Sequence, residues 1–230
     1  MIKERNYRGW LGFQKFLREY ASHQKSHRDL LLFRGHADAT WPLETTLDRH
    51  RKFAIDDVRD QYYAALIQEF EREAIRSPGE AENLPSQGDA LDLLARHHGL
   101  PSPILDWSAS PYVASFFAFA GAPPGATDAA VWVLDRSRLD PVSSRVEIID
   151  SPTLLRYNPR ALRQQGVFAR VRSILQPLTQ SLEKALTKLV IPSSSRGAAL
   201  AELDAMSINA AMLFGDLDAA ARTAVYRVDS

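Results

Sequence analysis

The sequence predicts an α+β fold, in which helices and strands are interspersed along one chain. Residues 56–75 have the pattern of a long helix. Residues 129–135 (AAVWVLD) have the valine and aromatic content of a buried strand. The chain shows no repeating strand–helix–strand unit, which disfavours a doubly wound parallel sheet.

Composition narrows the class of protein further. The 230 residues are enough for one sizeable core. With 28 basic against 28 acidic side chains, the overall charge does not support broad binding to nucleic acid or an anionic membrane, and a local basic patch stays open. The absence of cysteine excludes disulfides, thiolate metal sites and a cysteine nucleophile. No secretory signal and no bilayer-length apolar run is visible, so we expect a cytoplasmic protein without a membrane partner.

Apolar spacing, glycine and proline define the elements of the first half. Gly35 ends a short apolar run, Gly99 ends a helix pattern, and Pro111 suits the first turn of the helix that follows. The expected elements are helix 10–22, strand 29–35, helix 56–75, helix 90–98, a short strand or turn at 103–108, helix 112–120 and strand 129–135.

The second half is less regular, and its elements are shorter. The expected elements are a strand at 146–150, a turn followed by a strand within 158–171, a helix that runs into a short strand within 178–192, and helices at 198–208 and 216–228.

Arg34 and Gly35 are the first candidate site residues, because an arginine at a strand end can bind phosphate or carboxylate through two hydrogen bonds. Gly35 would let a ligand approach the backbone closely. The alternative is that Arg34 forms a structural ion pair that anchors the strand.

His97 and His98 precede the helix-ending Gly99. Adjacent helical residues point in different directions, so at most one is expected to face a site, and His98 is the candidate. Helix capping is the alternative role.

Asp106, Trp107, Ser108 and Ser110 form a polar junction between a strand and a helix. One serine is expected to cap the helix, and Trp107 is either a stacking surface or a core residue.

Further along, the RQQGVF stretch at 163–168 offers Gln164 and Gln165, which could orient a substrate or belong to a solvated turn. No P-loop, GxGxxG, HExxH or GxSxG motif is present.

Taken together, these motifs resemble the FRG-domain family, which is named for a Phe-Arg-Gly tripeptide, here Phe33-Arg34-Gly35. The matching stretches are LLFRG, WPL with a downstream arginine or histidine, ARHHGLPSPILDWSASPYVASFFAFA, DAAVWVLD, RQQGVF and MLFGDLDAAA, in that order. The resemblance implies one FRG-type domain over 1–230, with a core from about 31 to 221 and an N-terminal helical extension at 1–30.

The order of these motifs is also similar to that of the ADP-ribosyltransferase superfamily, which implies a split β core with surrounding helices. Its substrate would be NAD, with no metal. The resemblance places Arg34, Gly35, His98, Trp107, Ser108, Ser110 and Phe117 around NAD, and Arg34, His98, Asp106 and Gln165 in catalysis. Gln165 stands where these enzymes carry a glutamate, so Asp106 or Glu147 would have to supply the negative charge.

The resemblance therefore predicts transfer of ADP-ribose from NAD to a protein, a nucleic acid or water. It also implies the setting of a toxin or phage-defence effector, with an antitoxin or defence partner. The alternative from a different class is a non-catalytic FRG module that binds a nucleotide or a partner protein. A third alternative, a metal-dependent nuclease or hydrolase that uses His97, His98 and Asp106, is disfavoured by poor ligand spacing.

Overall fold

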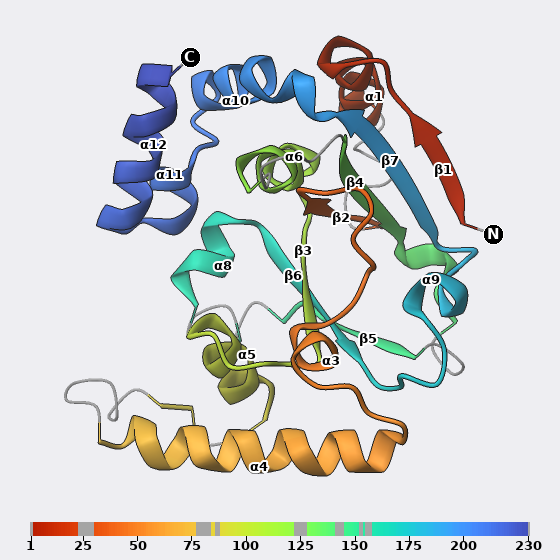
Figure 1. Ribbon diagram of the computed structural model, residues 1–230, viewed down its shortest axis with the longest axis vertical. Helices are drawn as coiled ribbons and strands as arrows, with labels where there is room; N and C mark the ends of the chain where they lie inside the picture. Colours follow the sequence, from red (N-terminus) through yellow and green to blue (C-terminus); the bar gives the residue numbers. More distant parts are fainter. Residues whose placement is uncertain are drawn as a thin grey trace.

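The protein folds around one seven-stranded sheet with helices on its faces (Figure 1). A computed structural model describes residues 2–22, 30–76, 84–85, 88–121, 128–140, 145–151, 154 and 158–229. The strand order is β1-β7-β4-β2-β3-β6-β5, and every neighbouring pair is antiparallel except β1 with β7. The strands are β1 (Lys3–Asn6), β2 (Leu31–His36), β3 (Ile104–Ser108), β4 (Asp128–Asp135), β5 (Val146–Ile149), β6 (Gly166–Val171) and β7 (Leu186–Pro192). A mixed α and β fold, as predicted, is confirmed.

The sheet is nearly divided between β2 and β3. All six residues of β2 pair with β4, but only Phe33 pairs across to β3, opposite Ser108. On its other side, β3 pairs along its full length with β6. The sheet therefore consists of two half-sheets, β1-β7-β4-β2 and β3-β6-β5, which touch through one residue pair.

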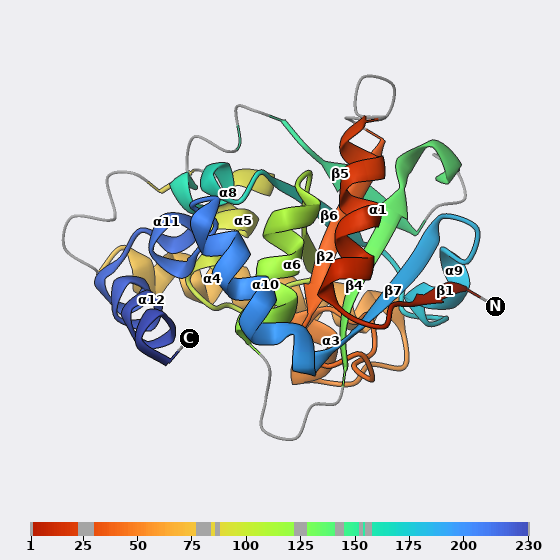
Figure 2. The same cartoon turned by 90° about the horizontal axis from the view of Figure 1, so that it is seen from above.

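The helices surround both half-sheets. Figures 1 and 2 show α10 lying outside α6 on one face, while α4 runs along the opposite end of the molecule. The helices are α1 (Trp10–Ser22), α3 (Thr46–His50), α4 (Asp56–Ala74), α5 (Asp89–His97), α6 (Pro111–Ala120), α8 (Pro159–Arg163), α9 (Leu178–Ser181), α10 (Arg196–Ala205), α11 (Ala210–Phe214) and α12 (Leu217–Asp229).

The core on the α6 face is built from aromatic residues distant in sequence. Phe13 of α1, Phe33 of β2 and Phe119 of α6 are almost fully buried in one cluster. Trp10 and Phe119 pack edge to face with their ring centroids 5.8 Å apart, a favourable aromatic geometry. The segment predicted as a helical extension thus contributes a helix to the main core, and it also contains strand β1, which pairs with β7.

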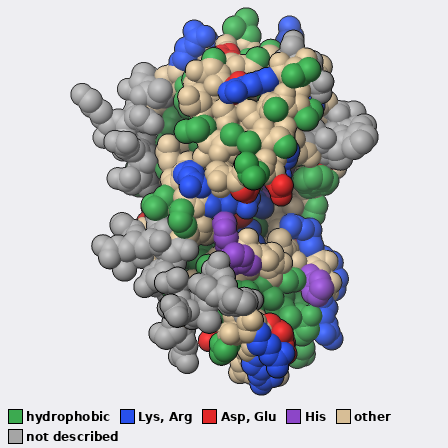
Figure 3. Space-filling model, turned by 90° about the vertical axis from the view of Figure 1, so that its left-hand side faces the viewer, with side chains coloured by type: hydrophobic (Ala, Val, Ile, Leu, Met, Phe, Trp, Pro, Cys, Tyr) green, Lys and Arg blue, Asp and Glu red, His purple; other side chains and the backbone are tan. Residues whose placement is uncertain are grey.

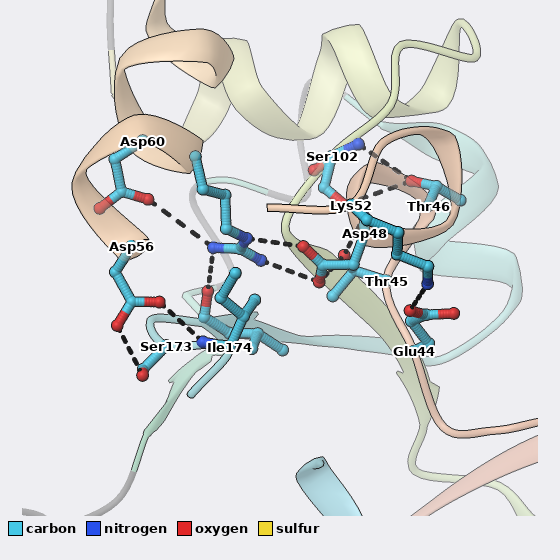
Figure 4. A network of polar contacts seen from close by, with 12 residues as sticks. Glu44, Thr45, Thr46, Asp48, Lys52, Asp56, Asp60, Ser102, Ser173 and Ile174 are labelled. Carbon is cyan, nitrogen blue, oxygen red and sulfur yellow. Dashed lines mark hydrogen bonds and ion pairs between the residues drawn. The ribbon is translucent and has the colours of Figure 1, made fainter. Parts of the chain in front are cut away.

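A buried ion pair holds α3 and α4 against the second half-sheet. Arg59 of α4 is 1 % exposed and donates from Nε to Oδ1 of Asp48 over 2.7 Å and from Nη1 to the carbonyl oxygen of Val171 over 3.0 Å. Figure 4 shows Asp48 held at the centre of this network, with Thr45 beside it. Removing one partner would leave a buried charge unpaired, so this pair fixes how α3 approaches β6.

The described helices include none with both the length and the apolar character needed to cross a membrane.

Candidate functional site

A cleft opens where the two half-sheets meet. It consists of two adjoining pockets of about 200 and 280 Å³, which share Asp106, Trp107, Arg160 and Gln164 in their walls. The first pocket lies between α5, α8, β3 and β6, and the second lies between β2 and α6. Figure 3 shows the α5 and α8 side of the molecule hollowed at mid-height, where basic, acidic and histidine side chains gather.

Arg34 lies at the junction between the half-sheets. Its Nη1 donates to the backbone oxygen of Asp106 over 2.6 Å, which links β2 to β3 beyond the single Phe33–Ser108 pair. Its Nε lies 3.3 Å from Nε2 of His36, two residues along β2. Burial lowers the pKa of Arg34 to about 10, although the charge of Asp106 favours the protonated form. Arg34 is therefore cationic at neutral pH.

The Asp106 carboxylate is held by an arginine of α5. Arg96 donates from Nε to Oδ1 over 2.7 Å and from Nη2 to Oδ2, a two-bond pairing that fixes the plane of both groups. Although burial would raise the pKa of Asp106, Arg96, Arg34 and Arg160 outweigh it and lower that pKa. Asp106 is thus ionised at neutral pH, and its side chain is still 51 % exposed to the cleft.

The third nitrogen of Arg96 is anchored by α3. Its Nη1 donates to Oγ1 of Thr46 over 3.2 Å, and the amide of Ser102 donates to the same oxygen over 2.9 Å. Figure 4 shows Thr46 and Ser102 beside the Asp48 network described above. The buried ion pair under α3 therefore supports the residue that positions Arg96, and through it Asp106.

Gly35 has a structural reason for being glycine. A Cβ atom at this position would overlap the carbonyl oxygen of Ala114 and lie 2.5 Å from the amide nitrogen of Ala118. Helix α6 therefore rests directly on the β2 backbone. The sequence suggested that Gly35 lets a ligand approach the backbone. Gly35 does line the second pocket, but the group that lies too close for any side chain is helix α6.

The junction residues divide into buried and cleft-facing groups. Ser108 lines the second pocket, but its hydroxyl already donates to the carbonyl oxygen of Gln164 over 2.7 Å and accepts from the amide of Ser110. Ser110 caps α6, as expected for one serine, by accepting from the amide of Val113 over 3.3 Å. Trp107 is 3 % exposed and belongs to the core as well as to the cleft wall.

For two candidate residues, His98 and Gln165, the structure places the preceding residue in the cleft wall instead. His97 and Gln164 line it, whereas His98 and Gln165 are exposed and are not among the described residues of its wall. His98 caps the end of α5. Gln165 has a φ of +47° and ends the turn between α8 and β6, where its carbonyl oxygen accepts from the amide of Ala109. Burial, followed by the charge of Arg160, lowers the pKa of His97, which keeps it neutral.

Glu147 lies away from the cleft wall. It is 2.8 Å from Nη2 of Arg172 and 4.0 Å from Nε of Arg170, so its charge is already paired on the outer strands. Within the described ranges, no three His, Asp or Glu side chains are grouped as metal ligands.

Residues 29–125 match the FRG domain family. The predicted resemblance is confirmed for this segment, which contains Arg34, Arg96, Asp106 and Phe117. No curated protein and no solved structure gives a significant match to the chain.

The FRG segment does not complete the cleft by itself. Arg160 and Gln164 lie beyond residue 125 and close the far wall. Sequence reasoning missed Arg96, Arg160 and Trp41 as cleft residues. Arg96 could have been found from the sequence, because it directly precedes the candidate histidines in the ARHH stretch. Arg160 lies in the short helix α8, where no local motif marks it.

Proposed function

We propose that the cleft binds NAD and that the protein is an ADP-ribosyltransferase-like enzyme. The observation that carries the proposal is that the FRG arginine and Asp106 meet at the division of the sheet, in a cleft that also exposes aromatic surface. Trp41, which is 45 % exposed, and Phe117 line the same pocket as Arg34. Arginines suit the diphosphate, and aromatic rings suit the nicotinamide and adenine.

The proposed reaction breaks the bond between C1′ of the ribose and N1 of nicotinamide. Both bonding electrons leave with the nicotinamide nitrogen, which becomes neutral, and the ribose becomes an oxocarbenium-like cation. A nucleophile of the acceptor then bonds to C1′ and loses its proton to water. The chain's contribution would be to fix the two halves of NAD and to place the ionised Asp106 near the developing positive charge.

One observation favours a second candidate, an FRG module that binds a nucleotide without turning it over. Asp106 already shares its charge with Arg96 through two hydrogen bonds, which weakens its field at the ribose. Gln164, the glutamine that reaches the cleft, carries no charge. In this candidate the arginines bind the ligand, and Asp106 keeps Arg96 in place.

Purified protein incubated with NAD labelled in the nicotinamide ring and with cell lysate tests both candidates. If the protein is the enzyme, nicotinamide is released. Asp106→Asn should then lower the rate about 100-fold, because the negative charge near the developing cation is lost. Binding of NAD should persist, because the cleft remains basic. Glu147→Gln is the matched control, because that carboxylate pairs with Arg172 outside the cleft, and it should leave the rate unchanged. Calorimetric binding of NAD without nicotinamide release, on a folded protein, would establish the second candidate and contradict the first.

A further inference from the structure

The cleft is strongly basic, but its three arginines are not equally available to a ligand. Arg34, Arg96 and Arg160 line it, and Asp106 is the single carboxylate among its described wall residues. Arg96 uses all three of its nitrogens, two on Asp106 and one on Thr46. Arg34 uses two, one on the Asp106 backbone and one on His36.

Arg160 is held by stacking. Its guanidinium lies 4.0 Å from the ring centroid of Phe214. Asp106 and Asp216 act on its charge, but no hydrogen bond or ion pair joins the guanidinium to any part of the chain that the structure describes. A stacked guanidinium keeps the N–H groups at its edge free to bind in the plane of the group. Arg160 is half-buried and forms part of both pocket walls, at the place where the two pockets adjoin.

The platform under Arg160 is itself fixed. The Phe214 and Phe117 rings pack edge to face with their centroids 5.9 Å apart. The carbonyl oxygen of Phe214 accepts from Nη1 of Arg163 over 2.9 Å. Gly215, with a φ of +77°, then ends α11 in the left-handed conformation. The guanidinium of Arg160 is therefore positioned before any ligand arrives, which lowers the entropic cost of binding.

We propose that Arg160 binds the phosphate groups of the cleft's ligand, and that this ligand is a nucleotide with a diphosphate or a terminal phosphate. Three arginines against one carboxylate leave an excess of two positive charges in the wall, which matches a doubly charged phosphate better than a single carboxylate. The inference rests on the proposed nucleotide-binding function and names the residue that reads the phosphate. In this arrangement Arg34 mainly joins the half-sheets and Arg160 holds the anion.

The test is calorimetric titration with inorganic diphosphate, ADP and adenosine, each on the wild type and on variants. Arg160→Met should weaken diphosphate and ADP binding at least 10-fold, whereas adenosine binding should change less than 2-fold. Arg160→Lys, which keeps the charge but loses the planar fork, should lie between the two. Arg222→Met is the matched control, because Arg222 stacks on the same Phe214 ring at 4.8 Å but is not among the described wall residues. It should change binding less than 2-fold.

The outcomes separate this inference from the proposed function. If Arg160→Met binds diphosphate and ADP as the wild type does, or if the wild type binds neither, the assignment of Arg160 is overturned even if NAD is cleaved. If diphosphate binding is lost in Arg160→Met but NAD is never turned over, the assignment stands and the enzymatic function fails. Circular dichroism melting of each variant excludes unfolding as the cause, and Arg160→Lys provides a second reading if Arg160→Met is unstable.

Discussion

At the scale of single residues, both ring nitrogens of His36 face a hydrogen-bond donor, although a backbone hydrogen bond with Trp41 favours its protonated form. Arg34 Nε lies 3.3 Å from its Nε2, and Trp132 Nε1 lies 3.3 Å from its Nδ1. A neutral imidazole accepts a hydrogen bond at one nitrogen, whereas an imidazolium carries N–H groups at both and accepts none. Protonation of His36 would therefore break the hydrogen bond that it accepts and bring N–H groups together on both sides of the ring. Burial, followed by the charge of Arg34, lowers the pKa of His36 to about 3.

This pKa predicts acid sensitivity. An unfolded chain protonates His36 below about pH 6.5, whereas the folded protein does not until about pH 3, so unfolding takes up a proton in this window. The free energy of unfolding should therefore fall as the pH falls, by up to about 1.4 kcal/mol per pH unit, and be flat above pH 6.5 for this group. His36→Gln should remove this part of the slope in urea unfolding between pH 5 and pH 7. Parallel pH profiles for the two proteins would contradict the assignment.

The direction of single side chains explains why the sequence indicated His98 and Gln165, whereas His97 and Gln164 line the cleft. His97 and His98 are adjacent, so their side chains leave α5 in different directions, and only the packing of α5 on the sheet decides which one meets the cleft. The same holds for Gln164 and Gln165, where the left-handed backbone at Gln165 sets the direction. Arg34 and Asp106 were found because each stands at a junction that the sequence itself marks with glycine, serine and proline.

At the scale of elements, local composition decides what could be predicted. Strand β4 and helix α4 follow the expected ranges closely because each carries its own pattern of apolar residues. Strand β1 was not expected, since its KERN sequence is exposed at every position and it is held by pairing to β7. The helix expected before β7 is only the short α9, because apolar spacing over so few residues does not separate a helix from a strand.

Packing of α6 on β2 predicts a large effect of one methyl group. Gly35→Ala would push a Cβ into the α6 backbone at Ala114 and Ala118, and backbone atoms cannot turn aside as a flexible side chain can. We expect a loss of roughly 3 kcal/mol in the free energy of unfolding, measured by urea titration. Gly12→Ala on α1 is the matched control. Among the described atoms its Cβ would meet only Tyr7, at 3.9 Å, and the change should stabilise the helix by about 1 kcal/mol. Equal effects at the two positions would contradict the role given to Gly35.

At the scale of the whole molecule, the cleft is a product of the divided sheet. One wall comes from β2 and α6, and the other comes from α5, α8, β3 and β6. No single stretch of sequence contains it, and the family match to residues 29–125 ends before α8. This is why the sequence indicated individual residues of the site but did not show that Arg160 meets Asp106 and Arg34 in one cavity.

The same architecture predicts how a ligand should act on the fold. Because the half-sheets touch through Phe33 and Ser108 and through the Arg34–Asp106 bond, a nucleotide that contacts both walls should hold them together. At a concentration 100 times its Kd, binding adds about 2.7 kcal/mol, which corresponds to about 100-fold slower exchange for amides released by opening at this junction. Hydrogen–deuterium exchange with saturating NAD should show this protection in both β2 and β3. Edge strand β1 is the internal control, since it lies on the far side of β7 and should be unchanged. Protection confined to one half-sheet would mean that the ligand contacts only one wall, and equal protection in β1 would mean that it acts elsewhere.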